Sequence, residues 1–434
     1  MLKTTSKKGF GMTTYCARLI ASFVLLYSAS LLATNGANLI SSTTASRGMG
    51  GTGVAHFHDE RTAAIMSPSL LSKSMLPDGG WNFGLDLTYL NGNVRSDVRN
   101  YTDTVSSGEK ESKHRPGYIP AIAAVNRVNE HLVWGFVYYG AAGSMVDYKD
   151  EVTHSKLKVE YGMARLGVAA SYRQEKFSFG LAPLYNMGNF AINTREASGE
   201  QSSRKPDTQG AFGIQVGASL FLLDELTVSL TYLSPAKFKY KGVVDLDAYT
   251  LTEADGKLDD LSLDQPTELA FGLSWLPITD LGLALDFRSL DWAATEGFGD
   301  IGWKRQLVIA LGGKYRIDAF TLRAGVNMAN GPIEDVSGEV GLETSDVSGK
   351  ALTKAGISGL NAVGFPAISE THYTLGLGHM VNEQFSWDLA FMMSPKASLE
   401  RSGTVTSPAG SAPYSLKTSV SQYAFSAGVS YNLW

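Results

Sequence analysis

The chain has 434 residues, of which 44% are hydrophobic and 18% charged, and its formal net charge is −5. A mean hydropathy of −0.05, with no apolar run of about 18 residues after position 33, argues against a helical membrane protein. The mild acidity gives no indication of nucleic-acid binding, and the length allows one large domain or several.

Residues 1–36 are predicted to be a secretory signal peptide. Four basic residues between positions 3 and 18 precede the apolar run 19–32, and small residues follow it. Cleavage is expected between Ala33 and Ala37, so the only cysteine, Cys16, would leave with the signal. The mature chain would then have no thiol, no disulfide and no cysteine-based metal site or nucleophile.

Residues 37–80 are rich in Gly, Ser and Pro and show no regular alternation. The run Gly48 to Gly53 satisfies the dinucleotide pattern GxGxxG, but it lacks the buried strand, the helix and the acidic residue that this fingerprint needs. His56, His58 and Asp59 are suitable metal ligands in type, although so short a cluster is more often a solvated loop. We therefore predict neither a cofactor nor a metal here, and interpret the stretch as a separate compact segment.

From Trp81 to the end of the chain, apolar and polar residues alternate in short runs. The last run is the clearest: Tyr423, Phe425 and Val429 fall on one face of an extended strand, and small polar residues fall on the other. This strand ends the chain at Trp434, and such an aromatic ending is similar to the terminal strand by which outer-membrane barrels are recognised for assembly. The barrel assembly machinery is therefore an expected partner.

The connections between these strands alternate between short and long. Short turns are expected at 129–130, 173–175, 224–225, 277–280, 317–319 and 381–383. Long loops are expected near 91–116, 145–155, 191–207, 244–259, 293–302, 331–369 and 399–414. Bacterial barrels have short periplasmic turns and long outer loops and an even number of strands, which this rhythm satisfies.

The predicted fold is all-β: a 14-stranded antiparallel transmembrane β-barrel over residues 81–434, with residues 37–80 as a plug in its lumen. In the strands compared, charged side chains fall on one face, as they must if the other face meets lipid. A soluble β-sandwich would also alternate, but it would not explain the signal, the terminal Trp434 and the loop rhythm together. Pro120 and Pro183 interrupt strands, and bulges are expected there.

Several segments resemble, in order and spacing, the FadL/TodX family of outer-membrane transporters of long-chain fatty acids and hydrophobic hydrocarbons. These segments are SRGMGGTGVA with Ser67-Pro68-Ser69-Leu70, LVWGFVYYGAAG at 132–143, FSFGL at 177–181, LTYLSPAKFKYKG at 230–242, Pro266-Thr267-Glu268, Asp291-Trp292, and Lys304 with 309–325. The family usually has Asn-Pro-Ala where this chain has Ser67-Pro68-Ser69, which leaves the plug contacts around Pro68 in question.

The resemblance implies a mechanism. The plug would be a hatch, with Gly50, Gly51 and Pro68 as its matching residues. Ligand would bind an outer groove, pass to an internal apolar pocket and leave sideways at a kink in the third strand. Gly143 matches the family's kink glycine, and Gly140 would weaken strand pairing beside it.

Basic residues are the candidates for binding a ligand carboxylate. Lys304 matches a basic residue near the outer end of the tenth strand, and Arg195 is a looser match to an arginine at the end of the fifth. Arg288 and Arg323 are expected on the lumen face, in a charge network with Asp286 and Asp388, with direct ligand contact as the alternative.

The predicted function is passive uptake of long-chain fatty acids or other hydrophobic small molecules across a bacterial outer membrane, without enzymatic activity. The alternatives are a channel for aromatic or alkane hydrocarbons and a porin for polar solutes. A porin would need an open lumen without the segment 37–80. An enzyme would need a serine beside His372 or His379, and no GxSxG motif is present.

Overall fold

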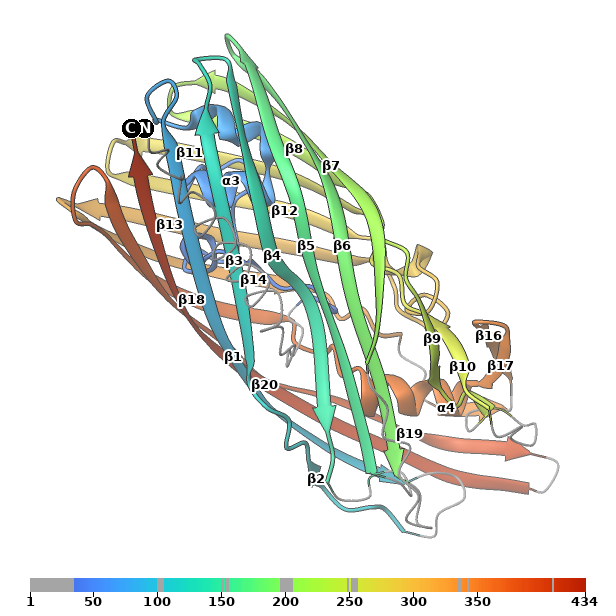
Figure 1. The fold of residues 1–434 in the computed structure, drawn as a ribbon. Helices are drawn as coiled ribbons and strands as arrows, with labels where there is room; N and C mark the ends of the chain where they lie inside the picture. The colour runs from blue at the N-terminus through green and yellow to red at the C-terminus, as the bar shows by residue number, and fades with distance from the viewer. Residues whose placement is uncertain are drawn as a thin grey trace, which may run out of the picture.

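The computed structural model describes residues 35–99, 105–149, 152, 156–195, 206–247, 250, 257–334, 338–341, 343–407 and 410–434. Within these residues, 14 antiparallel strands close into one barrel (Figure 1). In chain order they are β1 (Trp81–Arg99), β3 (Gly117–Arg127), β4 (Leu132–Asp147), β5 (Lys156–Gln174), β6 (Phe177–Arg195), β7 (Asp207–Leu223), β8 (Leu226–Leu233), β11 (Glu268–Ile278), β12 (Leu281–Leu290), β13 (Gln306–Ile317), β14 (Phe320–Ala329), β18 (Thr371–Met380), β19 (Phe385–Ser407) and β20 (Gly410–Leu433).

The other elements are short and lie before the barrel or in its long connections. Before the barrel come α2 (Thr44–Arg47), α3 (Glu60–Met66) and the 3₁₀ helix η1 (Pro68–Lys73). The connections carry β2 (Lys110–Glu111), β9 (Lys239–Val244), β10 (Asp259–Ser262), η3 (Trp292–Ala294), β15 (Gly338–Gly341), β16 (Thr344–Val347), β17 (Lys350–Thr353), α4 (Lys354–Gly359) and η4 (Leu360–Gly364). No helix in the described ranges is both long and apolar enough to cross a membrane.

The barrel closes between its first and last strands. β1 pairs with β20 from Trp81 opposite Leu433 to Arg99 opposite Ser415, in one continuous register. The other barrel strands each pair with the strands before and after them in the chain. A closed ladder leaves no strand edge facing lipid, which is the condition for a sheet to cross a membrane. The predicted 14-stranded antiparallel barrel is confirmed.

All the short connections lie at one end of the barrel, called here the turn end. They fall at 128–131, 175–176, 224–225, 279–280, 318–319 and 381–384, and each overlaps a turn that the sequence predicts. The long connections lie at the opposite end, called here the loop end (Figure 1). Trp434 follows β20 at the turn end, beside the start of β1.

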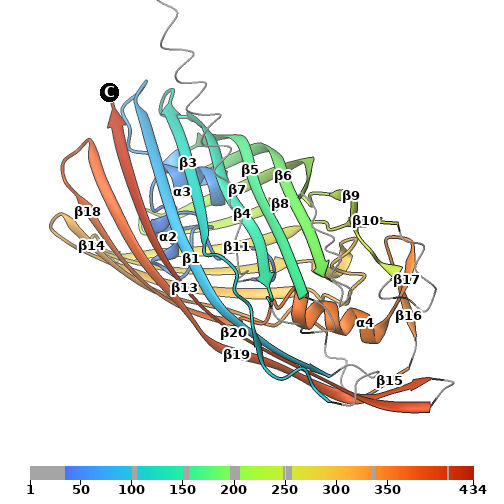
Figure 2. The same ribbon diagram turned by 60° about the horizontal axis from the view of Figure 1, so that its bottom comes forward.

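Several strands run further than the sequence predicts, and β1, β19 and β20 do so by the most residues. β19 and β20 continue to Ser407 and from Gly410, so most of the loop expected at 399–414 is a paired hairpin. β1 likewise continues to Arg99. Figure 2 shows β19 and β20 extending together at the loop end. Beyond the lipid a paired strand has no need of a greasy outer face, so the alternation that marks the membrane part stops before the strands do.

The bulges expected at Pro120 and Pro183 are absent, and that prediction is wrong. Pro120 keeps the β1 register opposite Leu87, and Pro183 keeps the β7 register opposite Ile214. The β5–β6 ladder omits two pairs beside Pro183 and then resumes in the same register. Because proline lacks only one N–H, each residue interrupts the ladder on one side and leaves the other intact.

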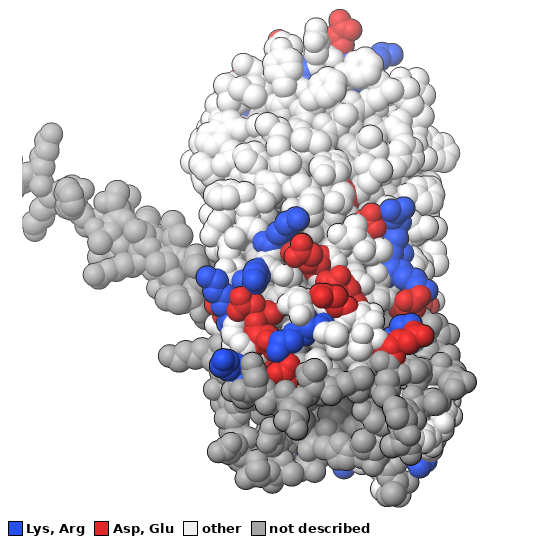
Figure 3. Space-filling model, turned by 90° about the vertical axis from the view of Figure 1, so that its right-hand side faces the viewer, with Lys and Arg blue, Asp and Glu red and all other residues white. Residues whose placement is uncertain are grey.

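The barrel is apolar outside and polar inside. On β1, Phe83, Leu85 and Leu87 are 43%, 39% and 49% exposed, while Asp86 and Thr88 are fully buried. A soluble sandwich would bury the first set and expose the second. Figure 3 shows one face of the barrel, where a broad band almost without charged side chains separates the turn end from a belt of mixed charges toward the loops. This is the surface that a lipid bilayer requires.

Aromatic side chains gather at both borders of this band. Trp81 stacks on Phe83 and meets Trp134 edge to face near the turn end. Tyr89 lies against Tyr118 and Tyr423 nearer the loop end, with ring centroids 5.7 and 6.2 Å apart. Two aromatic girdles of this kind mark the two interfaces of a membrane barrel.

The N-terminal segment, residues 35–80, lies mostly inside the barrel toward its turn end (Figures 1 and 2). Its residues from Asn35 to Ala55 are all buried. α2 contacts β1, β18, β19 and β20, while η1 contacts β4, β5, β6 and β7 on the opposite wall. The segment therefore reaches across the lumen, and its position defines the space that remains inside the barrel.

Candidate functional site

At Gly50 and Gly51 the backbone of the N-terminal segment packs closely against neighbouring backbone. Both have a positive φ, +74° and +78°, which glycine adopts without strain. A Cβ on Gly50 would lie 2.6 Å from the carbonyl oxygen of Leu311 on β13. The Gly50 N–H donates to Thr374 Oγ1 at 2.8 Å, and Asn327 Nδ2 donates to the Gly50 carbonyl at 3.1 Å. The turn is thus fixed to the barrel wall by contacts that only glycine allows.

The serines beside Pro68 have partners of their own. Pro68 begins η1, and Ser69 Oγ lies 2.7 Å from Ser219 Oγ on β7. Ser178 Oγ on β6 donates to the Ser69 carbonyl at 2.7 Å. The departure from the family's Asn-Pro-Ala therefore places a hydroxyl at 69 that bonds the barrel wall, and Gly180 on β6 gives the backbone the room to approach.

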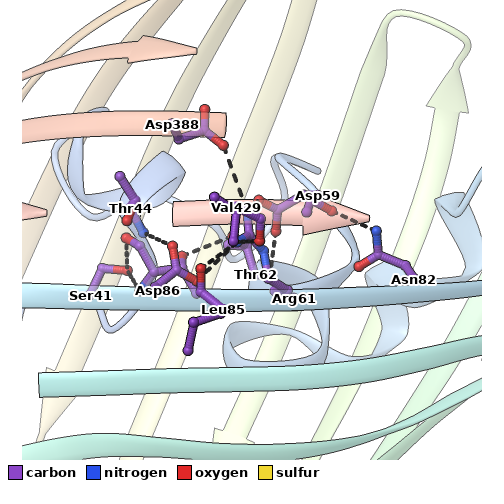
Figure 4. Close-up of polar contacts among 12 residues, drawn as sticks. Ser41, Thr44, Asp59, Arg61, Thr62, Asn82, Leu85, Asp86, Asp388 and Val429 are labelled. Carbon is purple, nitrogen blue, oxygen red and sulfur yellow. Dashed lines mark hydrogen bonds and ion pairs between the residues drawn. The ribbon is translucent and has the colours of Figure 1, made fainter. Parts of the chain in front are cut away.

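Arg61 of α3 brings a positive charge among three carboxylates (Figure 4). Its guanidinium lies 2.9 Å from Asp59, 3.3 Å from Asp86 on β1 and 3.6 Å from Asp388 on β19. It also donates to the Val429 carbonyl on β20 at 2.7 Å. The side chain is 1% exposed. The segment is therefore held to the seam between the first and last strands by a buried ionic cluster.

The wall of the barrel is incomplete beside β4. The β3–β4 ladder ends at Ala121 opposite Tyr139, so β4 has no partner on β3 from Gly140 onward. A register shift between Gly140 and Ala142 on the β5 side marks a bulge at the same place. The sequence singled out Gly140 and Gly143 for a kink, and both lie in this stretch of β4.

The N-terminal segment takes the place of the missing strand. Asn38 and Ala142 form an antiparallel bridge. The Leu39 N–H donates to the Ala141 carbonyl at 3.1 Å, and the Gly143 N–H donates to the Ala37 carbonyl at 2.9 Å. Ser42 Oγ donates to the Gly140 carbonyl at 2.7 Å. Residues 37–42 thus satisfy the backbone of β4 that β3 leaves unpaired, and they cover the gap from inside.

An internal pocket of about 60 Å³ lies beside this covered gap. Its apolar lining comes from both the segment and the wall, including Leu39, Ile40, Ile65, Tyr139 and Leu233. Its charged lining is Arg165, Glu268 and Arg288. Ligand sites are usually about 300–1,000 Å³, so this space is too small for a long hydrocarbon unless residues 38–42 move.

Two of the arginines that the sequence singled out have carboxylate partners. Arg288 makes a two-pronged contact with Glu268 at 2.7 and 2.9 Å, and Arg323 lies 2.7 Å from Asp388. Asp286, expected in the same network, instead accepts the backbone N–H groups of Gly53 and Val54. The predicted lumen charges are therefore used largely to hold the segment and each other.

Arg165 on β5 is a lumen arginine that sequence reasoning missed. It is 8% exposed, and its Nε donates to Asn186 Oδ1 at 3.0 Å. Among the described residues, no carboxylate lies within ion-pair distance of it. The signal for it was present, because Arg165 alternates with outward-facing Leu166, but one charge on a polar face does not disclose whether it is paired.

The two outer candidates lie apart from this pocket. Lys304 precedes β13 at the loop end, where its side chain is 55% exposed and lies 3.3 Å from Glu334. Arg195 is the last residue of β6, and its side chain lies outside the described residues. The structure therefore does not bring Lys304 together with Arg165 and Arg288.

Between the pocket and the loop end lies a closely packed aromatic cluster. Phe298 contacts Trp292, Trp303, Phe365 and Tyr161, with ring centroids 4.5–5.9 Å apart. All five side chains are no more than 2% exposed. Rings in this arrangement gain stacking and edge-to-face contacts beyond their buried area. The lumen is thus occupied by apolar side chains on the loop side as well as by the N-terminal segment on the turn side.

His56 and His58 each lie within hydrogen-bond distance of another group of the protein. His56 Nδ1 lies 2.8 Å from Ser274 Oγ, and His58 Nε2 donates to the Thr52 carbonyl. Burial lowers the pKa of His58 to about 3 and that of His56 well below its usual value, so both are neutral. In the part of the chain that the structure describes, no three His, Cys, Asp or Glu side chains are grouped to hold a metal, and His372 has no hydrogen-bond partner.

Comparison with known proteins gives one family. The model of the family described as outer membrane protein transport protein (OMPP1/FadL/TodX) matches residues 25–347, well over half of the chain. No curated protein sequence matches the chain.

Several solved structures share the fold. A Pseudomonas aeruginosa FadL homologue superposes with a TM-score of 0.69 at 14% identity, covering 91% of this chain and 99% of its own. The P. putida toluene transporter TodX gives 0.62 at 17%, again covering 91% and 99%. The Ralstonia pickettii toluene transporter TbuX gives 0.59 at 14%, with the same coverage. At these identities the likeness is one of fold.

Proposed function

Since this chain belongs to the OMPP1/FadL/TodX family, whose members transport hydrophobic compounds across the outer membrane, we propose that its ligand is a long-chain fatty acid. The family is one of transporters and not of enzymes. Transport would be passive, because burying an alkyl chain releases about 0.8 kcal/mol per CH₂ and apolar surface alone can capture the ligand.

We choose a fatty acid over a neutral hydrocarbon because of the charge in the internal pocket. Arg165 and Arg288 with Glu268 leave a net positive charge in an otherwise apolar cavity. Glu268 is engaged by Arg288, so Arg165 is the group with donors left for a carboxylate. A carboxylate held by an arginine makes short charge-assisted hydrogen bonds, whereas a neutral hydrocarbon gains nothing from that charge. We assign the head-group contact to Arg165, and keep Arg288 and Arg323 as supporting charges.

The size of the pocket supports a hatch role for residues 37–80. A cavity of about 60 Å³ cannot hold an alkyl chain, and residues 38–42 form one of its sides. Displacing them would enlarge the pocket and uncover the gap beside β4 in one step. Gly50, Gly51 and Pro68 lie in the part of the segment that stays bonded to the barrel, so they would act as the fixed base of the hatch.

Exit would be lateral, through the gap at Gly140 to Gly143. The ladder between β3 and β4 is already absent there, so only the contacts of residues 37–42 need to break. A hydrophobic ligand would then pass into the membrane without crossing water. Lys304 and Arg195 remain predictions for the first contact at the loop end, where an exposed cation can attract an anionic ligand.

A hydrocarbon channel is the second candidate, because TodX and TbuX, which share the fold, are toluene transporters. In that case Arg165 would have a structural role, through its hydrogen bond to Asn186. A porin for polar solutes is disfavoured, because the N-terminal segment and the aromatic cluster fill much of the lumen.

The test is uptake of labelled oleate and labelled toluene by cells that lack their own transporter. We expect the intact protein to raise oleate uptake, and Arg165→Gln to lower it about tenfold, since losing one charge-assisted contact costs about 1.5–3 kcal/mol. Arg305→Gln, at an exposed arginine paired with Asp291, is the control and should change nothing. Uptake of toluene alone, unaffected by Arg165→Gln, would replace the fatty acid with a neutral ligand.

A further inference from the structure

A second interruption of the barrel wall lies between β18 and β19, away from the gap beside β4. The β18–β19 ladder ends at Tyr373 opposite Met393, because β18 begins at Thr371 while β19 runs on to Ser407. From Ser394 to Ser402, β19 is paired only with β20, and β15 covers its free edge from Gly403 onward. Pro395, which has no N–H, lies within a register shift at the start of this stretch.

A niche of about 480 Å³ occupies this interruption. Its outward rim includes Glu370, Tyr373 and Lys396, all exposed, and its apolar floor includes Ile333, Ala367 and Ile368. This volume is within the range of small-molecule sites, and it is much larger than the internal pocket beside Arg165. The niche is therefore large enough to receive part of an alkyl chain from outside the barrel.

The niche is closed toward the lumen. On the buried face of β20, Gln422 Nε2 donates to Ser369 Oγ at 2.7 Å, and Gln422 pairs with Ser394 of β19. Ala367 and Ile368 are 6% and 9% exposed, and they pack in the core beneath the loops. A molecule in the niche would thus meet a wall and not a passage, which separates this place from any route for a transported ligand.

The depth and charge of the niche indicate what would occupy it. Tyr373, Met393 and Tyr423 lie side by side across three strands, in the outer aromatic girdle. The niche begins one residue beyond that row, at the level of lipid head groups. Lys396 makes no hydrogen bond or ion pair with any described residue. Glu370 Oε1 accepts the N–H of Gly331, so its carboxylate is partly engaged.

We propose that this niche holds a phosphate-bearing lipid of the outer leaflet, with the phosphate on Lys396 and the start of one acyl chain against Ile333 and Ile368. An ammonium group and a phosphate make charge-assisted hydrogen bonds, and the aromatic girdle fixes the head group at the right depth. The bound lipid completes the barrel wall where β18 is too short to do so.

The experiment is native mass spectrometry of the purified protein with added dimyristoyl phosphatidic acid, counting the lipid molecules that stay bound. Dimyristoylglycerol, which lacks the phosphate, is the matched probe. We expect phosphatidic acid to be retained and Lys396→Glu to reduce its retention about tenfold, the loss of roughly one charge-assisted contact. Ala397→Trp, which fills the niche, should abolish retention while the barrel still folds, as its shift in gel mobility on heating reports.

Lys417→Glu is the control, because Lys417 is an exposed lysine on neighbouring β20 that is paired with Glu400. It should keep retention within about twofold of the unchanged protein, as expected for an exposed ion pair. The proposal is overturned if Lys396→Glu retains as much phosphatidic acid as the unchanged protein, if Lys417→Glu loses as much, or if dimyristoylglycerol stays bound equally well. Oleate uptake should be unaltered in Lys396→Glu, so this result and the transport result are independent.

Discussion

At the scale of single residues, Arg61 places a full charge in the interior, where three carboxylates surround it. We predict that Arg61→Met unseats the N-terminal segment, since removing one partner of a buried ionic cluster costs about 3–5 kcal/mol. The barrel should still form, because the strand ladders do not depend on this side chain. Single-channel recordings in planar bilayers should show frequent open events that the unchanged protein lacks.

Arg95→Met is the control for that substitution. Arg95 also has two acidic partners, Glu109 and Glu111, but it is 41% exposed. Exposed pairs contribute little, so its removal should leave the recordings unchanged. Equal opening in both variants, or in neither, would mean that the buried cluster does not hold the segment in place.

The lumen charges show which residue-level features a sequence discloses. Alternation places Arg288, Arg323 and Asp388 on the inner face, and the structure agrees. Alternation does not reveal that Arg288 pairs with Glu268, or that Asp286 accepts hydrogen bonds from backbone N–H groups. Nor can it place Arg61, whose partners lie on β1 and β19, because these contacts depend on how the N-terminal segment sits inside the closed barrel.

At the scale of elements, the turn at Gly50 is predicted to be intolerant of any side chain. Gly50→Ala adds a strained left-handed residue and a Cβ that lies 2.6 Å from the Leu311 carbonyl oxygen. We expect the segment to detach from β13 and β14, and proteolysis in folded barrels to cut it much faster. A detached segment should also open the channel in planar bilayers.

Gly79→Ala separates strain from contact in this experiment. Gly79 has a similar φ of +80°, but nothing lies within 4 Å of a Cβ there. Its substitution costs only the backbone strain, about 1–2 kcal/mol, because the added methyl group meets no atom of the wall. If Gly79→Ala released the segment as readily as Gly50→Ala, the close packing at Gly50 would not be the cause.

The sequence predicts elements well where the membrane imposes an alternation of apolar and polar residues. It predicts them poorly where a segment faces water or lies inside the lumen. The short turns were found because they interrupt a strict period-two alternation. The outer hairpin of β19 and β20 was mistaken for a loop, because strands beyond the lipid lose the greasy face. The pairing of residues 37–39 with β4 has no signature in either segment, because each forms only part of a ladder.

At the scale of the whole molecule, closure between β1 and β20 follows from the sequence, since an open edge cannot face lipid. Trp434 lies beyond the last pair, Trp81 with Leu433, and is 52% exposed. We predict that deleting Trp434 lowers the assembled fraction in cells several-fold but leaves refolding into detergent unchanged. This separation is expected if the residue serves recognition by the assembly machinery and not the stability of the barrel.

Trp275→Ala is the comparison for that deletion. Trp275 is an outward tryptophan with nearly the same exposure, 49%, but it lies in the middle of the chain. Its loss should affect assembly in cells no more than refolding in detergent. If deleting Trp434 impaired both processes equally, its role would be structural. That result would contradict recognition of Trp434 by the barrel assembly machinery.

Lateral exit can be tested with a disulfide that fixes the N-terminal segment over the gap beside β4. Asn38 and Ala142 are opposite each other in a pair without mutual hydrogen bonds, where Cα atoms are about 4.5 Å apart and a disulfide fits. The only native cysteine is Cys16, in the predicted signal, so Asn38→Cys with Ala142→Cys gives a single defined bridge. Each single substitution is a control for the cysteines themselves.

Oleate uptake would be compared between the bridged protein and the same protein after reduction. We predict that the bridge lowers uptake about tenfold or more, and that reduction restores it, because the ligand can leave only when residues 37–42 move away from β4. Uptake at the same rate with the bridge intact would contradict lateral exit at this gap and would require another path out of the barrel.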